Sequence, residues 1–452
     1  MRNLILISVI ALKLISCQTS EKIEDIVVIG GGLMGSSTAW ELSKYGQNVL
    51  LLEQQDSIYT FGSSLGEARI SRSLGPKNDI FSYLQQTSVK ETNNLIDYLN
   101  EGETRTLHGM EDIYTTSPVT YMYSTSQFNE VETLLDDQKD KYEYASNKEK
   151  AEEKFGMKIP DTTIVIREFK QYSGTLNPKI LIQKLHQGIR KSGNPVNYNQ
   201  KVTSLKKENG IYKIKITDTK TGTIKTILSK KVVAAAGPYN GTLVKDVAPY
   251  FSHLISPKRL FLSFIKIKSD KYDMLTSDQK DRLVSSYPVA YLNSEIFYSM
   301  IEKYDKKQRP IFKVGAHFLR TEIEDLDKVW EKELTAQEIL WSKKKTADYL
   351  NKLDLSIELS DLEYDRGYSC VYSLTESEVP YVTNIIKNKA EVDSSFVLVG
   401  GMSGIGAKGS LAYGLFAADL ILGHKNDSAM YQKTKSALGT ERLLGDLENI
   451  DK

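Results

Sequence analysis

A buried strand, a glycine-rich turn and a helix follow one another near the start of the chain, and they constrain the fold more than any other feature. Residues 26–29 read Ile-Val-Val-Ile and lead directly into the pattern Gly30-x-Gly32-x-x-Gly35. Gly30 allows a tight turn, Gly32 lets a pyrophosphate approach the backbone, and Gly35 lets the following helix pack closely on the strand. The helix predicted over 33–45 points its free N–H groups and partial positive charge at the phosphates. The pattern therefore predicts a dinucleotide-binding domain of the Rossmann type.

An acidic residue stands where such a domain binds the ribose. Glu53 ends the strand predicted after the first helix, and a carboxylate at that point accepts hydrogen bonds from the ribose hydroxyls. An acid there argues against NADP but does not separate NAD from FAD. A glycine turn without a ligand is the alternative. The order of strand, turn, helix, second strand and acid favours nucleotide binding over it.

Length and composition limit the class of protein. A chain of 452 residues exceeds what one compact core usually holds, so two domains are expected. Its 59 basic and 58 acidic residues leave a formal net charge of +1, which predicts no general attraction to nucleic acid or to an acidic membrane. Two cysteines cannot build a disulfide framework, and five histidines without a Cys/His cluster predict no metal site.

The first residues resemble an export signal. An apolar run over 4–12 follows Arg2; it is too short to span a bilayer and fits the hydrophobic region of a secretory signal. The run closes on "LISC", which resembles the bacterial lipoprotein box, in which the cysteine is lipidated and becomes the new N-terminus. We therefore expect a lipoprotein-type signal peptide over 1–17 and an exported protein anchored to the membrane only through Cys17. Lys13 departs from that pattern, and a plain secretory signal or an uncleaved leader stays open.

The rest of the chain alternates between helical and strand-like segments. Helices are predicted over 76–100, 127–155, 178–192 and 335–353, and strands over much of 193–237 and 256–318. A strand, a glycine turn and a helix recur at 394–423, so the βαβ signatures stand at the two ends of the chain. The economical fold is of the α/β class: one Rossmann-type domain built from both ends, with an inserted strand-rich α+β domain.

Two further segments carry a resemblance to a known family. Residues 399–408 form the second glycine turn, "VGGMSGIGAK", and residues 366–372 read "RGYSCVY". With the first glycine turn, they resemble the FAD-dependent amine oxidases of the monomeric sarcosine oxidase and N-methyltryptophan oxidase family, within the D-amino-acid oxidase superfamily. The resemblance runs from about residue 24 to about residue 435, and segments 120–165 and 320–360 diverge from it.

The resemblance implies FAD rather than NAD as the cofactor. In that family the cysteine of an Arg-Gly-x-x-Cys-x-Tyr segment forms a thioether to the flavin, and Cys370 stands at that position. The thiolate is the reactive form, and nearby positive charge would favour it; a buried inert thiol is the alternative. The cofactor contacts expected from the resemblance are Gly30, Gly32, Gly35, Glu53, Ser63, Arg69, Val202, Cys370, Gly404, Gly406 and Lys408.

The resemblance also implies a site for an amino-acid substrate. Residues 62–72, "GSSLGEARISR", match the family's arginine segment, in which Arg69 lies against the flavin ring and Arg72 binds the substrate carboxylate. Lys408 matches the lysine that completes this carboxylate clamp. Two cations around one carboxylate fix its orientation. For each of these residues taken alone, a solvated surface charge is the alternative.

Residues 312–317, "FKVGAH", match the family's segment for reaction with oxygen. By the resemblance, Lys313 lies beside flavin N5 and stabilises the charge that develops on dioxygen. Alternation along a strand would direct Lys313 and His317 to one face, and family members place a histidine near the substrate. A hydrogen-bonded structural histidine is the alternative for His317. Tyr298 and Tyr372 fall where family members have aromatic walls.

The function implied is that of an oxidase of secondary amino acids, N-alkyl or cyclic, which oxidises a C–N bond to an imine and reduces dioxygen to hydrogen peroxide. One departure is Ser64-Leu65, where relatives have a histidine pair, so an aliphatic residue replaces a polar neighbour of the flavin. A dehydrogenase that passes electrons to a quinone or a carrier protein is one alternative. A non-catalytic surface lipoprotein that keeps the fold is another. The sequence names neither the substrate nor the oligomeric state.

The expected domain order follows from the same resemblance. The FAD-binding domain is expected over 24–110, 173–250 and 361–440, and the substrate domain over 111–172 and 251–360.

Overall fold

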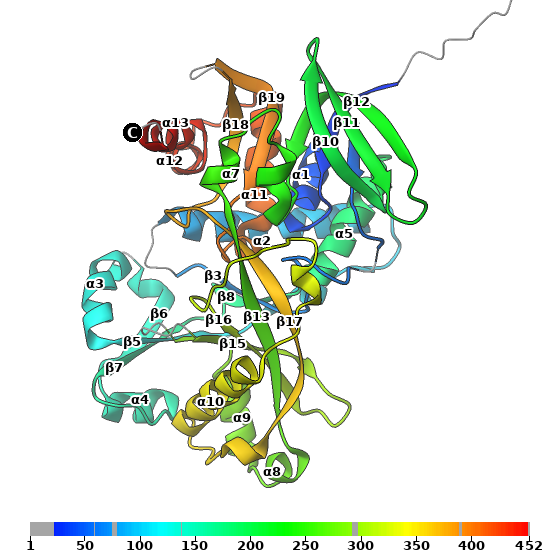
Figure 1. Ribbon diagram of the computed structural model, residues 1–452. Coiled ribbons are helices and arrows are strands. Elements are labelled where there is room, and N and C mark those ends of the chain that lie inside the picture. The colour runs from blue at the N-terminus through cyan, green and yellow to red at the C-terminus, as the bar shows by residue number, and fades with distance from the viewer. Residues whose placement is uncertain are drawn as a thin grey trace, which may run out of the picture.

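Two bodies, each built around a large sheet, meet in the middle of the molecule (Figure 1). This computed structural model describes residues 22–57, 59–74, 79–136, 138–291, 297–387 and 391–450. The expected signal peptide over 1–17 and its Cys17 lie outside the described residues, so export and lipid anchoring stay predictions.

The upper body in Figure 1 contains a mixed sheet with a parallel centre. Within the described residues its eight strands are β1 (Ile23–Ile29), β2 (Val49–Leu52), β9 (Val196–Asn197), β10 (Gln200–Glu208), β11 (Ile211–Asp218), β12 (Ile224–Ala234), β18 (Tyr381–Lys387) and β19 (Glu391–Gly400). The parallel strands follow the order β9-β2-β1-β12-β19. β11 and β18 add to this centre in antiparallel orientation, and β10 pairs with β11.

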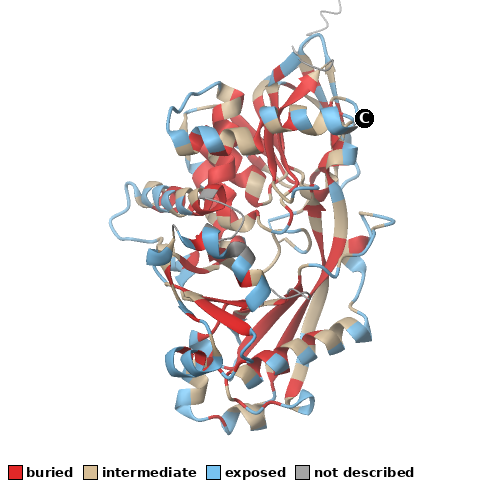
Figure 2. Cartoon of the chain, turned by 90° about the vertical axis from the view of Figure 1, so that its left-hand side faces the viewer, coloured by how far each residue is buried: buried red, intermediate tan, exposed pale blue. Residues whose placement is uncertain are grey.

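Strand alternation explains why this sheet is covered on both faces. In β1, Ile26 and Val28 join one apolar cluster, and Val27 and Ile29 join the cluster on the opposite face. The first cluster includes residues of α1 (Leu33–Lys44), α2 (Asp79–Asn100), α5 (Pro178–Lys191), α11 (Ser410–Leu422) and α12 (Ala429–Leu438). The second includes residues at α6 (Asn240–Leu243), α7 (Phe251–Leu254) and α13 (Thr440–Ile450). Buried residues accordingly concentrate in the sheet and the helix faces against it (Figure 2). The predicted helices over 33–45, 76–100 and 178–192 are confirmed.

The lower body contains a second sheet, mostly antiparallel. In the described part of the chain its strands are, in spatial order, β17 (Leu362–Leu374), β13 (Ser256–Ile267), β16 (Pro310–Ala316), β15 (Phe297–Tyr304), β14 (Val289–Tyr291), β5 (Val119–Ser124), β7 (Thr163–Glu168) and β6 (Tyr142–Ala145). Its helices are α3 (Thr125–Asp136), α4 (Lys148–Phe155), α8 (Ser269–Asp273), α9 (Ser277–Ser285) and α10 (Ala336–Lys352). In β16, Phe312 and Val314 pack toward α9 and α10, so Ile311 and Lys313 face the other way, toward the first body.

The helix predicted over 127–155 is wrong in its middle. α3 ends at Asp136, α4 begins at Lys148, and the strand β6 lies between them. β6 pairs antiparallel with β7, and Tyr142 and Ala145 are buried. Sheet pairing and burial of these side chains therefore override the charge-rich, helix-like pattern.

A small third sheet lies between the two bodies. It consists of β3 (Arg69–Arg72), β8 (Ser173–Leu176) and β4 (Tyr114–Thr116). Short 3₁₀ turns complete the fold: η1 (Met110–Asp112), η2 (Lys139–Lys141), η3 (Gly237–Tyr239), η4 (Val329–Glu331), η5 (Leu359–Asp361) and η6 (Ala407–Gly409). β17 falls in the segment 361–440 that was expected in the FAD-binding domain, yet it pairs with β13 of the second sheet. Cys370 therefore reaches the middle of the molecule from the second sheet.

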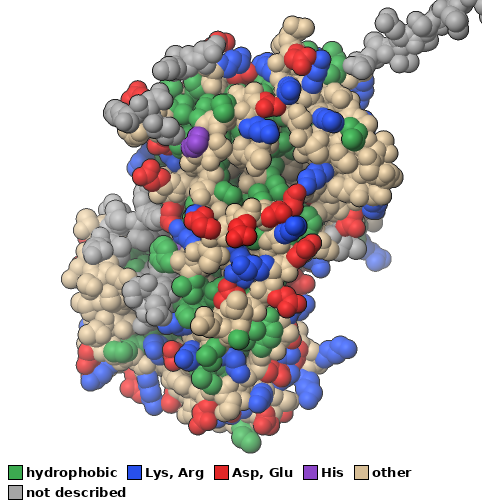
Figure 3. All heavy atoms as spheres, in the orientation of Figure 1, with side chains coloured by type: hydrophobic (Ala, Val, Ile, Leu, Met, Phe, Trp, Pro, Cys, Tyr) green, Lys and Arg blue, Asp and Glu red, His purple; other side chains and the backbone are tan. Residues whose placement is uncertain are grey.

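The surface shows no segregation of charge on the face drawn in Figure 3, where Lys and Arg side chains are interspersed with Asp and Glu. No helix within the described ranges is both long enough and apolar enough to cross a bilayer.

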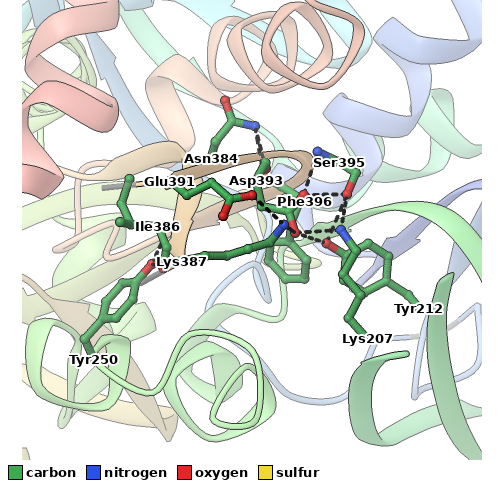
Figure 4. A network of polar contacts seen from close by, with 10 residues as sticks. All are labelled: Lys207, Tyr212, Tyr250, Asn384, Ile386, Lys387, Glu391, Asp393, Ser395 and Phe396. Atoms are coloured by element: carbon green, nitrogen blue, oxygen red, sulfur yellow. Dashed lines mark hydrogen bonds and ion pairs between the residues drawn. The ribbon is translucent and has the colours of Figure 1, made fainter. Parts of the chain in front are cut away.

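A buried carboxylate ties the edge strands of the first sheet together (Figure 4). Asp393 of β19 is only 4% exposed and accepts from Lys207 Nζ at 2.7 Å, Lys387 Nζ at 3.1 Å and Tyr212 Oη at 2.9 Å. Ser395 adds its backbone N–H at 3.1 Å and its Oγ at 2.6 Å. Although burial opposes ionisation, these bonds hold the pKa of Asp393 well below its usual range. The meander β10–β11 and the hairpin β18–β19 are thus joined through one ionised side chain.

Asp393→Asn should lower the free energy of unfolding by about 2–4 kcal/mol at pH 7, because two lysines lose their buried partner. Since the folded pKa lies below the unfolded one, the contribution is complete above the unfolded value of about 4 and is lost as the pH falls toward the folded pKa. Urea unfolding of both proteins at pH 7, 5 and 3 measures this. The exposed Asp25→Asn, which loses the surface pair with Lys230, should cost less than about 1 kcal/mol. If Asp393→Asn lowers the free energy of unfolding by the same amount at all three pH values, the assignment of Asp393 as an ionised carboxylate is contradicted.

Candidate active site

One cavity of about 1040 Å³ lies where the two bodies meet. Its lining, in the part of the chain that the structure describes, includes every predicted site residue except Gly35: Gly30, Gly32, Glu53, Ser63, Arg69, Arg72, Val202, Tyr298, Lys313, His317, Cys370, Tyr372, Gly404, Gly406 and Lys408. These residues come from both large sheets and from β3, so the fold brings distant segments to one place. What each does to a ligand stays a prediction.

The first glycine turn has the close packing that its sequence predicted. Gly30 has a φ of +103°, and a Cβ there would lie 2.4 Å from the carbonyl oxygen of Ala235. A Cβ on Gly35 would lie 1.8 Å from the carbonyl oxygen of Gly30, so helix α1 packs directly on the turn. Among the described residues, a Cβ on Gly32 would meet only the Ser64 side chain, at 3.2 Å. Gly30 and Gly35 therefore serve packing, and Gly32 keeps the backbone open toward the cavity.

Glu53 holds this turn from within the cavity. Its carboxylate accepts from the backbone N–H of Gly31 at 2.7 Å and of Gln55 at 2.8 Å. Ser64 supports the other side, because its Oγ accepts from the N–H of Leu33 at 3.2 Å. The acid predicted to bind the ribose thus lies at the turn, already oriented by two hydrogen bonds.

A buried histidine that the sequence did not single out supports the turn from the α5 side. Ser36 Oγ donates to the carbonyl of Gly31 at 2.7 Å and lies 2.8 Å from His186 Nε2, and Tyr198 Oη lies 2.8 Å from His186 Nδ1. Because Ser36 donates to the carbonyl, Nε2 must donate to Ser36 and Nδ1 must accept from Tyr198. Burial, with the charge of Arg190, lowers the pKa of His186 to about 4. In the sequence, His186 lies on the apolar face of a predicted helix, and that position indicates only a residue of the core.

The segment before β3 wraps its own arginine in carbonyl groups. Arg69 donates to the carbonyl oxygens of Ser63 at 3.2 Å and Ala68 at 2.8 Å, and also to that of Leu65. Gly66 has a φ of +117°, and a Cβ on it would lie 2.9 Å from Arg69 Nη1 and 3.0 Å from Lys313 Nζ. Gly66 therefore lets the arginine and the lysine approach each other. Leu65, which stands where the resemblance implies a histidine, is not among the described residues that line the cavity.

Two tyrosines form a wall of the cavity because two glycines make room for them. A Cβ on Gly315 would lie 2.3 Å from the Tyr298 ring, and one on Gly404 would lie 2.4 Å from the Tyr372 ring. The two hydroxyls are 3.3 Å apart, and the His317 ring lies 5.5 Å from that of Tyr372. Burial raises the pKa of Tyr372 to about 12 and raises that of Tyr298 well above its usual range, so both are neutral phenols.

Lys313 lies deep in the cavity wall and is paired. Its ammonium donates to Glu302 Oε2 at 2.7 Å and to the carbonyl of Ala68 at 2.7 Å, and both charged side chains are 1% exposed. Burial and the neighbouring Arg69 lower the pKa of Lys313 to about 7, while Glu302 opposes that shift. Glu302 was missed in the sequence, since one glutamate in a strand carries no distinguishing pattern.

Cys370 is buried in an apolar patch with Leu262, Phe264 and Ile311. Burial raises the pKa of its thiol, and the charges of Arg69 and Lys313 act in the opposite direction. The positive groups expected near the thiol are therefore present, but burial outweighs them in the free protein.

Arg72 offers an unsatisfied donor to the cavity. Its guanidinium lies over the Tyr121 ring at 5.2 Å, and Tyr121 donates to Glu168 Oε2 at 2.6 Å. Nη1 of Arg72 is buried and has no hydrogen-bond partner within the described residues. Lys408 of η6 lines the same cavity, η6 contacts β3, and its Nζ lies 5.4 Å from the Phe81 ring centre. An anion is the kind of ligand that would satisfy the buried Nη1 donor of Arg72.

A segment described above as divergent also lines the cavity, at residues 325–327 and Trp330. Trp330 Nε1 donates to Tyr239 Oη at 3.1 Å, and Tyr239 donates to the carbonyl of Leu326 at 3.3 Å. Asp327 pairs with Lys201 Nζ at 3.0 Å, and the Trp330 and Phe61 rings lie 5.7 Å apart. These contacts join residues far apart in the sequence, so no local pattern could have signalled them.

The residues present fit an FAD molecule with space for a small substrate. The cavity volume lies just above the range of about 300–1,000 Å³ typical of ligand pockets. The open Gly32 backbone and Glu53 suit the dinucleotide part, and the excess of cations around Arg69 suits an electron-accepting ring. No group of three or more His, Cys, Asp or Glu that could hold a metal ion occurs in the described segments.

Gly32→Ala and Gly35→Ala distinguish a glycine that leaves space for a ligand from a glycine that is needed for packing. Gly32→Ala should fold with a melting temperature close to that of the parent yet bind FAD about tenfold or more weakly, because the methyl group enters the phosphate path. Gly35→Ala should fail to fold or melt far lower, because its methyl overlaps the Gly30 carbonyl. FAD titration in a Cys370→Ala background, where binding is reversible, with thermal unfolding of the apoproteins, checks both. Equal FAD affinity in Gly32→Ala would contradict the assigned phosphate path.

Comparison with known proteins agrees with this geometry. The model of the DAO family, described as FAD dependent oxidoreductase, matches residues 25–420. The probable sarcosine oxidase of Arabidopsis thaliana is 44% identical over 64 residues, which are 14% of this chain and 15% of that protein. The peroxisomal sarcosine oxidase of Mus musculus is 44% identical over 54 residues, 12% of this chain and 14% of that protein. The aligned stretches thus span about a seventh of these relatives.

Solved structures share the fold over nearly the whole chain. A mutant of NikD, described as an unusual amino acid oxidase essential for nikkomycin biosynthesis, has a TM-score of 0.68 at 17% identity, covering 92% of this chain and 97% of that chain. Glycine oxidase from Geobacillus kaustophilus has a TM-score of 0.64 at 16% identity, covering 89% and 96%. The predicted α/β fold class and the resemblance are confirmed. Because one family model covers most of the sequence, the chain belongs to the DAO family of FAD dependent oxidoreductases.

Proposed function

We propose that this FAD-dependent oxidoreductase is an oxidase of secondary amino acids, N-alkyl or cyclic, that uses dioxygen as acceptor. The observation that carries the proposal is the buried Nη1 of Arg72, which lies in the wall of the cavity and has no hydrogen-bond partner in the part of the chain that the structure describes. A donor of this kind needs an anionic partner, and an amino-acid carboxylate supplies one. The short matches to proteins described as sarcosine oxidases support the same substrate class.

The protein's own part in the reaction begins with orientation of the substrate. Arg72 and Lys408 bind the carboxylate, and Tyr121 holds the Arg72 guanidinium under its ring. We infer that the carbon next to nitrogen lies beside Cys370 and Lys313, which line the same cavity. This part of the cavity is called the reacting end. When bound, FAD supplies the two-electron acceptor for the C–N bond, leaving an imine that water hydrolyses. Cys370 would hold the cofactor covalently through its sulfur.

The tyrosine wall adds no charge to the reacting end. Tyr298 and Tyr372 stay neutral because burial raises the pKa of both, so they donate hydrogen bonds without adding charge. The amine must bind without its proton, since a protonated nitrogen has no lone pair to share, and the cations of the site disfavour the protonated form. Lys313 supplies the fixed positive charge that reduction of dioxygen to hydrogen peroxide requires.

Arg72→Met should lower kcat/KM for an N-methyl amino acid by about 10²–10³, mainly through KM, because a charge-assisted bond to the carboxylate is lost. The corresponding amine without a carboxylate should show nearly the same kcat/KM in both proteins. A peroxide-coupled assay over a series of N-alkyl and cyclic amino acids gives both values. Arg105→Met, at an exposed arginine outside the cavity, serves as the control.

Peroxide formation also decides between acceptors. Substrate-dependent reduction of a dye without oxygen consumption would replace the oxidase by a dehydrogenase. A flavin-free protein without turnover would remove the enzymatic proposal altogether.

Cys370→Ala should abolish the flavin fluorescence that the parent protein retains on a denaturing gel, because the mutant lacks the sulfur that would carry the cofactor. Cys17→Ala, which changes the other cysteine of the chain, should keep the fluorescent band. A parent protein that binds flavin but loses all fluorescence on denaturation would show that the cofactor is held without a covalent bond.

A further inference from the structure

Glu302 occupies an irregular point of strand β15. Ile301 pairs with Phe312 and Lys303 pairs with Ile311, so the register shifts at Glu302 and leaves it as the extra residue of a β-bulge. Bulges re-aim a side chain and are common beside functional sites. Here the side chain is directed inward and is 1% exposed, whereas the next residue, Lys303, is exposed.

The Glu302 carboxylate joins three separate parts of the site. Oε1 accepts from the backbone N–H of Glu67 at 2.6 Å, and Oε2 accepts from that of Ala68 at 3.0 Å. Oε2 also accepts from Lys313 Nζ at 2.7 Å. One carboxylate therefore fixes the backbone that leads into Arg69 and holds the ammonium of Lys313.

This carboxylate is the counter-charge of a cluster that is otherwise cationic. The Arg69 guanidinium donates to carbonyl oxygens, and no carboxylate among the described residues accepts a hydrogen bond from it. Lys313 uses two of its three N–H groups on Glu302 and Ala68, which leaves one for a group in the cavity. Two cations and one buried acid leave net positive charge at the reacting end.

We propose that Glu302 is a positioning residue that keeps Lys313 protonated and oriented at the reacting end of the cavity. This rests on the proposed binding of FAD between Arg69, Lys313 and Cys370. It assigns to β15 a role in the oxygen step that is separate from substrate binding by Arg72.

The electrostatics give the direction of the effect. Burial and Arg69 disfavour the charged form of Lys313, whose pKa is lowered to about 7, and Glu302 opposes them. The other titratable groups around the cluster of Arg69 and Lys313 are Cys370 and Tyr368 of β17 and Tyr298 of β15. Burial raises the pKa of all three, so they are neutral near pH 7 and cannot replace the missing charge. Without the Glu302 charge, Lys313 would lose its proton at a lower pH.

The molecule contains a matched control, Glu168 of β7. It is also buried and also accepts from two consecutive backbone N–H groups, those of Ser73 at 2.8 Å and Leu74 at 2.9 Å. Its remaining bonds come from Ser73 Oγ and Tyr121, and it does not contact Lys313. Glu168 thus holds the Arg72 end of the same segment, and Glu302 holds the Arg69 end. Substitution of Glu168 therefore tests the effect of releasing this segment without changing the surroundings of Lys313.

The decisive measurement is the pH profile of reoxidation of the reduced holoenzyme by dioxygen in stopped flow. Glu302→Gln should slow this step about 10–100-fold near pH 7.5 and move the pH midpoint down by about one unit or more, because the cation is lost earlier. Lys313→Met should slow the step at all pH values. The double variant should be no slower than Lys313→Met, since Glu302 acts through the lysine. Glu168→Gln should raise KM and leave the reoxidation midpoint in place.

A second readout does not depend on turnover or on oxygen. Sulfite binds to oxidised flavin as an anionic adduct, so its Kd reports the positive charge at the ring. Glu302→Gln should raise the sulfite Kd about tenfold near pH 7.5, with little change where Lys313 is protonated in both proteins. If the parent protein does not react with oxygen but binds sulfite in a Lys313-dependent way, the oxidase proposal fails while Glu302 is still tested.

An unchanged reoxidation midpoint and an unchanged sulfite Kd in Glu302→Gln, with both altered in Lys313→Met, would overturn the inference. Thermal unfolding shows whether Glu302→Gln holds its fold. If Glu302→Gln does not fold, Glu302→Asp is used instead, because it keeps the negative charge but shortens the side chain by one methylene and so moves the charge away from Lys313. Its midpoint should move in the same direction by a smaller amount; a folded aspartate variant with the parent midpoint would also overturn the inference.

Discussion

The cavity depends on the way in which two buried carboxylates hold the segment 67–74 between the sheets. Glu302 accepts from the backbone of Glu67 and Ala68, and Glu168 accepts from that of Ser73 and Leu74. Both acids belong to the second sheet, and the segment between them carries the two arginines of the site. Backbone N–H groups that would be costly to bury unpaired are thereby satisfied, and the segment is fixed at both ends.

Charge within the cavity follows from this arrangement. Arg69, Arg72, Lys313 and Lys408 all line it, and the carboxylates that hold the segment are turned to its backbone and to Lys313. In a buried site the effective dielectric is low, so unbalanced positive charge would act strongly on any anionic ligand and on a ring that accepts electrons. The same burial lowers the pKa of Lys313 and raises those of the tyrosines and the thiol, which keeps the other groups neutral.

Glycines determine where the large side chains of the site can lie. Gly66 lets Arg69 and Lys313 approach, Gly315 receives the Tyr298 ring, and Gly404 receives the Tyr372 ring. The second glycine turn predicted that Gly404 contacts the cofactor. Its contact with Tyr372 became visible only in the structure. A glycine serves both in a motif and in packing for one reason, which is that it has no Cβ.

Local pattern explains what could be predicted. Three predictions depend only on residues near one another in sequence: the first glycine turn, the acid after the second strand, and the common face of Lys313 and Gly315 on one strand. The periodicity of strands and helices was therefore sufficient to make them. The helix over 127–155 was predicted wrongly because β6 forms only by pairing with β7, which no local signal reports. His186 and Glu302 were missed for the same reason: their partners lie 150 and 235 residues away.

The sequence by itself determined the dinucleotide-binding turn, the family and the residue types of the site, because these depend on short motifs with a direct physical meaning. The tertiary structure decided which acid neutralises which cation, that Arg72 keeps a donor unpaired among the described residues, and that residues 325–327 and Trp330 line the cavity. Those outcomes depend on burial and on contacts between sheets, and burial becomes defined only when the chain has folded.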